Sequence, residues 1–253
     1  ITFDQGNAMP ELTVIVPCYN EGKRLGPLLD LIRANRELDW EWLFVDDGST
    51  DDTASAIQAA CTQADGQVRL HALPHNLGKG RAVREGIQQA TGELVGFVDA
   101  DLAASPLDFK AFLADDDLRA GEKVVIGVRL KTHDGKVQRY FRRHLLGRVF
   151  QTLVSALTGL HVYDTQCGFK LMSREAGRDL TADMRCDGFC FDVELLLLAD
   201  RRGVQIDERP IAWREQGDSS VRLRHMLAML VDIWRIRRRV RGLPPPEETA
   251  AAE

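Results

Sequence analysis

Two carboxylates separated by one residue, Asp99 and Asp101, follow an apolar run that predicts a buried strand over 94–98. Hard divalent cations such as Mg²⁺ and Mn²⁺ take oxygen ligands, and a nucleotide diphosphate can supply the oxygens that the protein does not. An Asp-x-Asp pair by itself is a weak signal, because such pairs are common in turns. Two other predicted strands also end in ligand-type polar residues, and together the three segments favour a metal and nucleotide site.

The second segment, Pro-Cys-Tyr-Asn-Glu at 17–21, ends the first predicted strand. Proline cannot donate to a strand ladder, so we expect the chain to leave the sheet at Pro17. Tyr19 has the chemistry to stack or hydrogen-bond, and Asn20 and Glu21 have the chemistry to read a base or a ribose. An Asx-type turn followed by a helix cap explains the same residues equally well.

The third segment, Asp-Asp-Gly-Ser-Thr at 46–50, ends the second predicted strand. Ser, Thr and Asp are favoured at helix starts, but a cap needs only one of them. The additional carboxylates, Asp46 and Asp47 before Gly48, indicate a nucleoside site, because a carboxylate accepts hydrogen bonds from a uracil or guanine N–H.

A glycine-containing segment at 76–81 precedes a predicted helix. Its glycines would let backbone N–H groups approach an anion at the start of that helix, where negative charge is favoured. Lys79 and Arg81 would add positive charge for a diphosphate. The order of residues in a Walker loop is missing, so the segment alone is a weak signal.

Two arginines and two acids complete the candidate set. Arg129 closes a predicted strand and Arg143 lies at the polar edge of an amphipathic helix predicted over 140–157, so both could hold one phosphate through their planar guanidinium groups. Asp192 and Glu194 open a predicted helix. Either acid could act as a base, and either could simply be a negative charge at a helix start.

The elements that must position these residues alternate along the first half of the chain. Apolar strand runs separated by helices indicate a mostly parallel sheet covered on both faces, which binds ligands at the carboxyl ends of its strands. The predicted strands are 12–16, 42–45, 68–73, 94–98 and 124–128, and the predicted helices are 23–37, 51–64, 79–90 and 106–119. In the second half we predict a loop entering a strand at 164–170, a helix over 191–202, a strand over 205–213 and a basic helix over 223–240.

Composition limits the classes of protein that are possible. The 253 residues, 44% of them hydrophobic, suffice for one large domain with a core. A net charge of −5 does not suggest a nucleic-acid binder, although two blocks, 129–148 and 222–241, each carry seven Lys and Arg against one Asp. Five cysteines without paired spacing, and no signal-like or membrane-spanning run, favour a cytoplasmic protein. Peripheral attachment of the basic blocks to an anionic membrane face is an alternative to packing on the core.

Together these segments resemble family 2 of the inverting nucleotide-sugar glycosyltransferases with the GT-A fold, over about residues 11–240. Within that family the chain is most similar to dolichyl-phosphate β-glucosyltransferases and their polyprenyl-phosphate relatives. The segments that carry the closer resemblance are Asp-Thr-Gln-Cys-Gly-Phe-Lys at 164–170, Phe-Asp-Val-Glu-Leu-Leu at 191–196, Trp-Arg-Glu at 213–215 and the serine pair at 219–220. Two residues after Asp101 the chain has Ala103, where the related mannosyltransferases often have Gln.

The resemblance implies a Rossmann-like α/β fold, a GT-A domain over 11–220 with an extension at 1–10, a basic amphipathic helix over 221–242 and a disordered tail over 243–253. It implies Mg²⁺ or Mn²⁺ held by Asp101 with Asp99. The implied catalytic residues are Asp101, Arg129, Arg143, Asp192 and Glu194. The implied donor-binding residues are Pro17, Tyr19, Asn20, Glu21, Asp46, Asp47, Gly48, Lys79, Asp99, Ala100 and Asp101. The implied acceptor-binding residues are Arg129, Arg143, Gln166, Ser219, Ser220 and Arg222.

The expected activity is therefore transfer of glucose from UDP-glucose to a polyprenyl, dolichyl-type phosphate with inversion. A GDP-mannose-dependent enzyme and a family member with a soluble hydroxyl acceptor remain alternatives. From a different class, a non-catalytic regulator that binds a nucleotide sugar is also open, although both acids of the Asp-x-Asp pair argue for catalysis.

Overall fold

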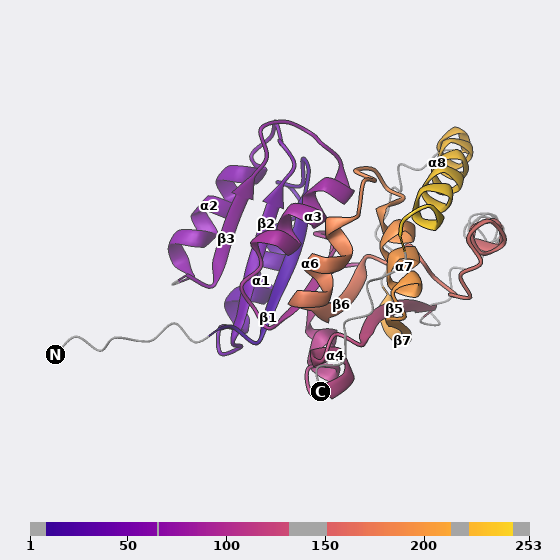
Figure 1. Cartoon of the computed structure of the whole chain (residues 1–253). Helices are drawn as coiled ribbons and strands as arrows, with labels where there is room; N and C mark the ends of the chain where they lie inside the picture. The colour runs from indigo at the N-terminus through magenta and orange to yellow at the C-terminus, as the bar shows by residue number, and fades with distance from the viewer. Residues whose placement is uncertain (1–8, 65, 132–150, 214–222, 245–253) are drawn as a thin grey trace.

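The computed structural model describes residues 9–64, 66–131, 151–213 and 223–244, and its centre is a seven-stranded sheet (Figure 1). The strand order is β3-β2-β1-β4-β6-β5-β7. The strands are β1 (Leu12–Cys18), β2 (Trp40–Asp46), β3 (Val68–Ala72), β4 (Leu94–Val98), β5 (Lys123–Lys131), β6 (Phe169–Ser173) and β7 (Gln205–Trp213). All five strands predicted in the first half are present.

Most neighbouring strands of the sheet run parallel. β1 pairs in parallel with β2 and β4, β2 with β3, and β5 with β7. Only β6 is antiparallel, to both β4 and β5. The predicted mostly parallel α/β sheet is therefore confirmed, and the carboxyl ends of β1, β2 and β4 lie side by side at one edge.

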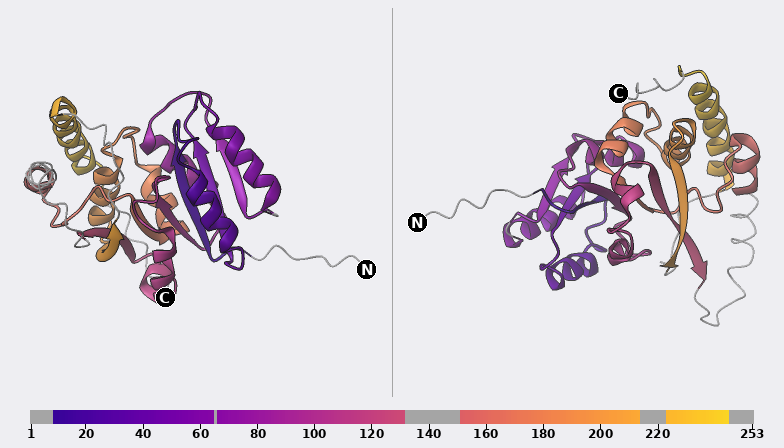
Figure 2. Two further views of the ribbon diagram at one scale, coloured as in Figure 1. Left: turned by 180° about the vertical axis from the view of Figure 1, so that it is seen from behind. Right: turned by 60° about the horizontal axis from the view of Figure 1, so that its bottom comes forward.

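Helices cover both faces of the sheet, as the opposite views show (Figure 2). Alternate residues of a strand point to opposite faces, so Val14 and Val16 pack in one apolar cluster and Ile15 packs in the other. One face holds α1 (Gly26–Ala34), α2 (Thr53–Gln63), the 3₁₀ helix η1 (Pro106–Ala111) and α4 (Asp116–Arg119). The other holds α3 (Lys79–Gln89), α6 (Arg174–Ala182), α7 (Phe191–Arg201) and α8 (Leu223–Arg241).

Pro17 does not end the first strand, and that prediction is wrong. β1 continues to Cys18, and Pro17 lies opposite Val45 of β2. The carbonyl of Cys18 accepts from Asp47 N on the β2 side, so the nitrogen of Pro17 faces the β4 side. Pairing between β1 and β4 has already ended there, with Ile15 opposite Phe97, and the missing N–H therefore costs no ladder bond.

The single helix predicted over 106–119 is also wrong, because the chain forms η1 and α4 as two short helices. Ser105 Oγ caps η1 by accepting from Leu107 N, and an Asp115 carboxylate oxygen starts α4 by accepting from Leu118 N. Two competing caps within this stretch break it into two helices. Helix α6 was not predicted. Ser173 Oγ caps it by accepting from Ala176 N, and a serine at this place is a sequence signal that could have indicated the helix.

The second half confirms the helix and strand predicted at 191–202 and 205–213, and α8 confirms the basic helix. Ile233, Ile236 and Val240 of α8 are buried in the cluster that includes α7. Residues 151–158 are helical, so the described part of the helix predicted over 140–157 is confirmed, and the rest of it lies outside the described residues. Within the four described ranges, no helix is both long enough and apolar enough to cross a membrane.

Candidate active site at the carboxyl ends of the strands

The ends of β1, β2 and β4 bring three carboxylates around one buried thiol, Cys18. Burial raises the pKa of Cys18 well above its usual value, and the carboxylates of Glu21, Asp46 and Asp99 raise it further. These acids come from three separate sequence segments, and the sheet order alone places them together. The predicted convergence of the strand ends is therefore present in the structure.

Asp101 also belongs to this group of carboxylates, because its charge acts on the Glu21 carboxyl. Burial raises the pKa of the Glu21 carboxyl, Arg24 opposes that change, and the nearby charges of Asp101 and Asp99 add to it. Leu102, directly after Asp101, has φ of 55°, a left-handed conformation that costs a leucine about 1–3 kcal/mol. The chain accepts this strain at the turn that holds the Asp-x-Asp pair.

The donor chemistry of this group fits a hard divalent cation. Its oxygen ligands are carboxylates held close together, and their mutual repulsion is what a bound cation would relieve. Among the residues that the structure describes, no three acidic, His or Cys side chains are arranged to hold a metal by themselves. A cation at Asp101 and Asp99 would therefore need further oxygens, which a diphosphate can supply.

Lys79 is the cation paired with Asp99. Its Nζ lies 2.5 Å from Asp99 Oδ1, and 5.9 Å from the centroid of the Phe191 ring. Burial lowers the pKa of the Lys79 ammonium, but Asp99 and then Asp192 outweigh burial, so the pKa is raised. Lys79 is the first residue of α3, so a charged ammonium is fixed beside the Asp-x-Asp pair.

Four backbone N–H groups of the glycine-containing segment are already bonded within the protein, which corrects the prediction that these groups bind an anion: they belong to Leu77, Gly78, Gly80 and Arg81. The carboxylate of Asp47 accepts from Leu77 N at 2.7 Å and from Gly78 N at 2.8 Å. The carbonyl of Asp187 accepts from Gly80 N at 2.8 Å. A side chain at Gly78, where φ is +103°, would lie 2.3 Å from that same carbonyl oxygen. The turn therefore presents the side chain of Lys79, and Asp47 holds the turn.

The segments at 17–21 and 46–50 are joined by hydrogen bonds. Asn20 Oδ1 accepts from Thr50 N at 2.9 Å, and Asn20 N donates to Ser49 Oγ at 2.9 Å. Asp46 Oδ1 accepts from Ser49 N at 3.2 Å. The amide oxygen of Asn20 is therefore used within the protein, as the turn interpretation of this segment expects, and not to read a base or a ribose. Tyr19 beside it is 46% exposed, which leaves its ring open to a stacking partner.

The motif at 164–170 lies directly against the Asp-x-Asp pair. A side chain at Gly168 would lie 2.3 Å from Asp99 Oδ2, so any larger residue there would displace the Asp99 carboxylate. Lys170 is fully buried, pairs with Asp192, and donates to the Cys167 carbonyl at 2.9 Å. Sequence reasoning missed both roles, although a lysine inside the apolar strand β6 is itself an unusual signal. Burial raises the pKa of Cys167 to about 12, so this thiol stays protonated.

Asp192 and Glu194 have different surroundings. Burial raises the pKa of the Asp192 carboxyl, Lys170 and then Lys79 oppose that change, and the charge of Asp99 adds to it, so Asp192 belongs to the carboxylate group. Glu194 is 0% exposed, and its carboxylate accepts from Arg185 N and Cys186 N and pairs with Arg239. A carboxylate so enclosed is not placed to take a proton from a substrate, and this corrects the catalytic role expected for Glu194.

Arg129 is held by two partners on the far side of β4. Its Nε and one terminal nitrogen lie 2.5 and 2.9 Å from the two Asp164 oxygens, and its guanidinium lies 5.1 Å from the centroid of the Trp213 ring. The side chain is still 42% exposed. Gln166, two residues after Asp164, is half-buried. The other expected acceptor residues lie outside the described residues: Arg143, Ser219, Ser220 and Arg222.

Comparison with known proteins gives one consistent result. The model of the family described as glycosyl transferase family 2 matches residues 13–181. A dolichyl-phosphate beta-glucosyltransferase of Trichomonas vaginalis is 37% identical over 239 residues, covering 88% of this chain and 70% of the relative. The enzyme of the same name from Saccharomyces cerevisiae is 35% identical over 231 residues, covering 84% and 69%.

Among solved structures, glucosyl-3-phosphoglycerate synthase from Mycobacterium tuberculosis, in complex with Mn²⁺, UDP-glucose and phosphoglyceric acid, superposes with a TM-score of 0.61. The match covers 93% of this chain and 81% of that one at 22% identity, so it speaks to the fold. The seven-stranded sheet with helices on both faces is the GT-A fold of such glycosyltransferases. The chain belongs to glycosyl transferase family 2.

Proposed function

We propose that this protein transfers a glucosyl unit from UDP-glucose to a polyprenyl phosphate of the dolichyl type, with inversion at the anomeric carbon. The observation that carries the proposal is the site at the strand ends, where Lys79 pairs with Asp99 beside Asp101. Eight relatives at 33–37% identity carry the name dolichyl-phosphate beta-glucosyltransferase, which supports the sugar and the acceptor. A fold neighbour solved with UDP-glucose supports the donor.

In the proposed reaction an oxygen of the acceptor phosphate attacks the anomeric carbon of glucose. The bond from that carbon to the diphosphate breaks, and its electron pair leaves with UDP. Asp101 and Asp99 would hold Mg²⁺ or Mn²⁺, which stabilises charge on the departing diphosphate. The ammonium of Lys79 adds a fixed positive charge at the same place, where it stabilises the leaving group more as charge develops.

A phosphate acceptor is ionised near neutral pH and needs no strong general base. The enclosed carboxylate of Glu194 is consistent with this chemistry. Asp192 is buried and pairs with Lys170, so it would act on the donor site through the neighbouring charges of Lys170 and Lys79. Arg129 is half-exposed and held in place by Asp164 and Trp213, so its guanidinium could meet the acceptor phosphate with little loss of conformational freedom.

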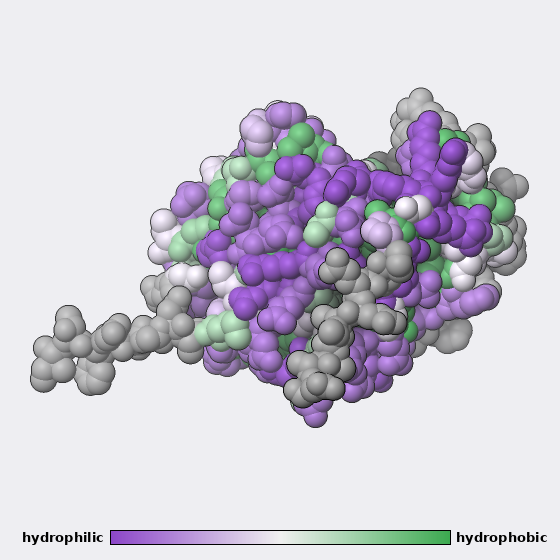
Figure 3. Space-filling model, viewed as in Figure 1, coloured by the Kyte–Doolittle hydropathy of each residue, from purple (hydrophilic) through white to green (hydrophobic). Residues whose placement is uncertain are grey.

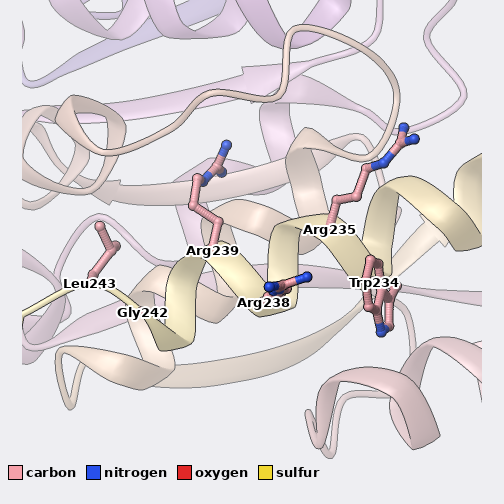
Figure 4. Close-up of a pocket in the computed structure, with 6 residues that line it drawn as sticks. All are labelled: Trp234, Arg235, Arg238, Arg239, Gly242 and Leu243. Carbon is pink, nitrogen blue, oxygen red and sulfur yellow. The ribbon is translucent and has the colours of Figure 1, made fainter.

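Helix α8 offers a surface suited to an anionic membrane, where a lipid-linked acceptor would be presented. Val231 and Trp234 are each 48% exposed and share one helix face with Arg235 and Arg238. The guanidinium of Arg238 lies 5.8 Å from the centroid of the Trp234 ring. Trp234, Arg235 and Arg238 border a shallow hollow of about 460 Å³ (Figure 4). Hydrophilic and hydrophobic surface adjoin over α8 (Figure 3). Tryptophan is favoured at the level of the lipid head groups, and arginine side chains are attracted to anionic head groups.

A soluble acceptor is the second candidate. The fold neighbour was solved with phosphoglyceric acid, a small phosphorylated acid, in its complex with UDP-glucose. Both candidates share the donor site and differ only in the molecule that supplies the attacking oxygen.

A donor-by-acceptor panel separates these readings. Nucleotide release is measured with UDP-glucose or GDP-mannose, each against polyprenyl phosphate, phosphoglyceric acid and a free sugar, with Mn²⁺ or Mg²⁺ present. We expect UDP release only with UDP-glucose and polyprenyl phosphate. Release with GDP-mannose alone would assign a mannosyltransferase, release with a soluble acceptor would assign the second candidate, and UDP binding without release would assign a regulator.

A further inference from the structure

The carboxylate of Glu194 holds a loop that the donor site depends on. Its oxygens accept from Arg185 N at 3.0 Å and from Cys186 N at 2.7 Å. Glu194 is 0% exposed, so these hydrogen bonds to a charged group are shielded from water. The position of the chain at 185–186 is therefore fixed from α7.

The next residue of this loop holds the start of α3. The Asp187 carbonyl accepts from Gly80 N at 2.8 Å and from Arg81 N at 3.3 Å. Arg84 of α3 donates to Asp187 Oδ1 at 2.7 Å and to the Met184 carbonyl at 3.0 Å. The first turn of α3, which carries Lys79, is thus held by the same loop that Glu194 holds.

Arg239 of α8 completes the arrangement. Its guanidinium pairs with Glu194, and α8 lies beside α7 (Figure 1). Burial lowers the pKa of Arg239 and the charge of Arg185 lowers it further, whereas Glu194 supplies the carboxylate that pairs with its guanidinium. Removal of Arg239 would leave the enclosed Glu194 carboxylate without its paired cation.

We propose that Glu194 and Arg239 are positioning residues for the donor site: they hold the loop 184–188 against the first turn of α3 and so fix Lys79 beside Asp99. The inference rests on the proposed function, because it takes Lys79 as a ligand of the donor diphosphate. It gives α8 a second role in addition to its proposed membrane surface, since the face carrying Arg239 supports the site from within the protein. It also gives a role to Glu194, which lies within the motif at 191–196 but is enclosed by the protein.

Two readouts on the 253-residue chain test this inference. Hydrogen exchange of the segment 77–84 reports the hold on α3 whether or not any nucleotide binds, and calorimetry reports UDP affinity with Mn²⁺. In Glu194→Gln the charge is lost but the shape is kept. We expect amide exchange at 77–84 to accelerate about tenfold or more and UDP affinity to fall about tenfold, the scale of one lost hydrogen bond to a charged group. The acceptor KM should stay unchanged.

Matched variants separate positioning from general loss of stability. Asp200→Ala removes an exposed acid from the same helix, and Arg241→Ala removes an exposed arginine from α8, so neither should change exchange at 77–84. Arg239→Lys keeps the charge and should fall between wild type and Arg239→Ala. The effects of Glu194→Gln and Arg239→Ala on UDP affinity should be clearly less than additive in the double variant, because both act on one contact.

The outcomes are distinguishable. Unchanged exchange at 77–84 in Glu194→Gln would overturn the inference, and so would full additivity of the two variants or an equal effect of Asp200→Ala. If wild-type protein binds no UDP, the proposed donor site is wrong, while the exchange measurement still decides whether Glu194 holds the loop. If Arg239→Ala does not fold, Glu194→Gln and Arg239→Lys carry the test.

Discussion

The hold of Asp47 on the Lys79 turn gives a prediction whose size follows from the structure. Asp47 is 3% exposed, and its carboxylate accepts from Leu77 N at 2.7 Å and from Gly78 N at 2.8 Å. In Asp47→Asn one of the two backbone N–H groups keeps a neutral oxygen acceptor, and the other faces the NH₂ group of the asparagine side chain. The loss of one hydrogen bond to a charged group is worth roughly 1.5–3 kcal/mol.

Without this hydrogen bond the turn before Lys79 leaves its native conformation more often, and donor binding must supply the free energy that restores it. We therefore expect UDP affinity with Mn²⁺, measured by calorimetry, to fall about tenfold to a hundredfold in Asp47→Asn. The matched control is Asp52→Asn, an exposed acid of the same loop, which should bind UDP as wild type does. A folded Asp47→Asn protein with wild-type UDP affinity would refute the reasoning that this carboxylate sets the turn.

The other predictions concern the metal, the acceptor and the pH dependence of stability. Asp101→Ala should abolish metal-dependent turnover with the thermal midpoint nearly unchanged, and activity within a few-fold of wild type at saturating Mn²⁺ would exclude it as a ligand. Arg129→Ala should raise the acceptor KM roughly tenfold or more with little change in UDP affinity, since a charged contact is lost; loss of UDP binding instead would place Arg129 in the donor site. Burial raises the pKa of Glu41, but hydrogen bonds from Thr13 and Thr91 outweigh burial and hold it below the usual 4.5. Glu41 therefore adds stability above pH 4.5 that is lost as the pH falls through its lowered folded-state value, and Glu41→Gln should flatten the acid side of a plot of unfolding midpoint against pH; an unchanged slope would contradict this.

The strand ends could be predicted from sequence because apolar runs fix the strands and polar residues follow them. Asp46, Asp99 and Asp101 lie where that pattern placed them, and Lys79 begins α3 as the spacing indicated. These features depend on local periodicity and on the general rule that parallel strands end at one edge.

The partners of those residues could not be predicted, because they depend on contacts between distant segments. The carbonyl that occupies the first amides of α3 belongs to Asp187, and no local pattern brings that loop to Gly80. Lys170 was hidden inside an apolar strand, and its role follows only from the position of Asp192 on α7. The surroundings of Glu194 could not be predicted either, because its paired cation, Arg239, comes from α8.

The product itself tests the central claim most directly. Purified protein is supplied with UDP-[1-¹³C]glucose, Mn²⁺ and a short polyprenyl phosphate, and the lipid product is isolated and its anomeric configuration determined by NMR. UDP-glucose is α-linked, so transfer with inversion predicts a β-linked glucosyl phosphate, and Asp101→Ala should form none. An α-linked product, or no glucosylated lipid while a soluble acceptor is glucosylated, would contradict the proposed reaction.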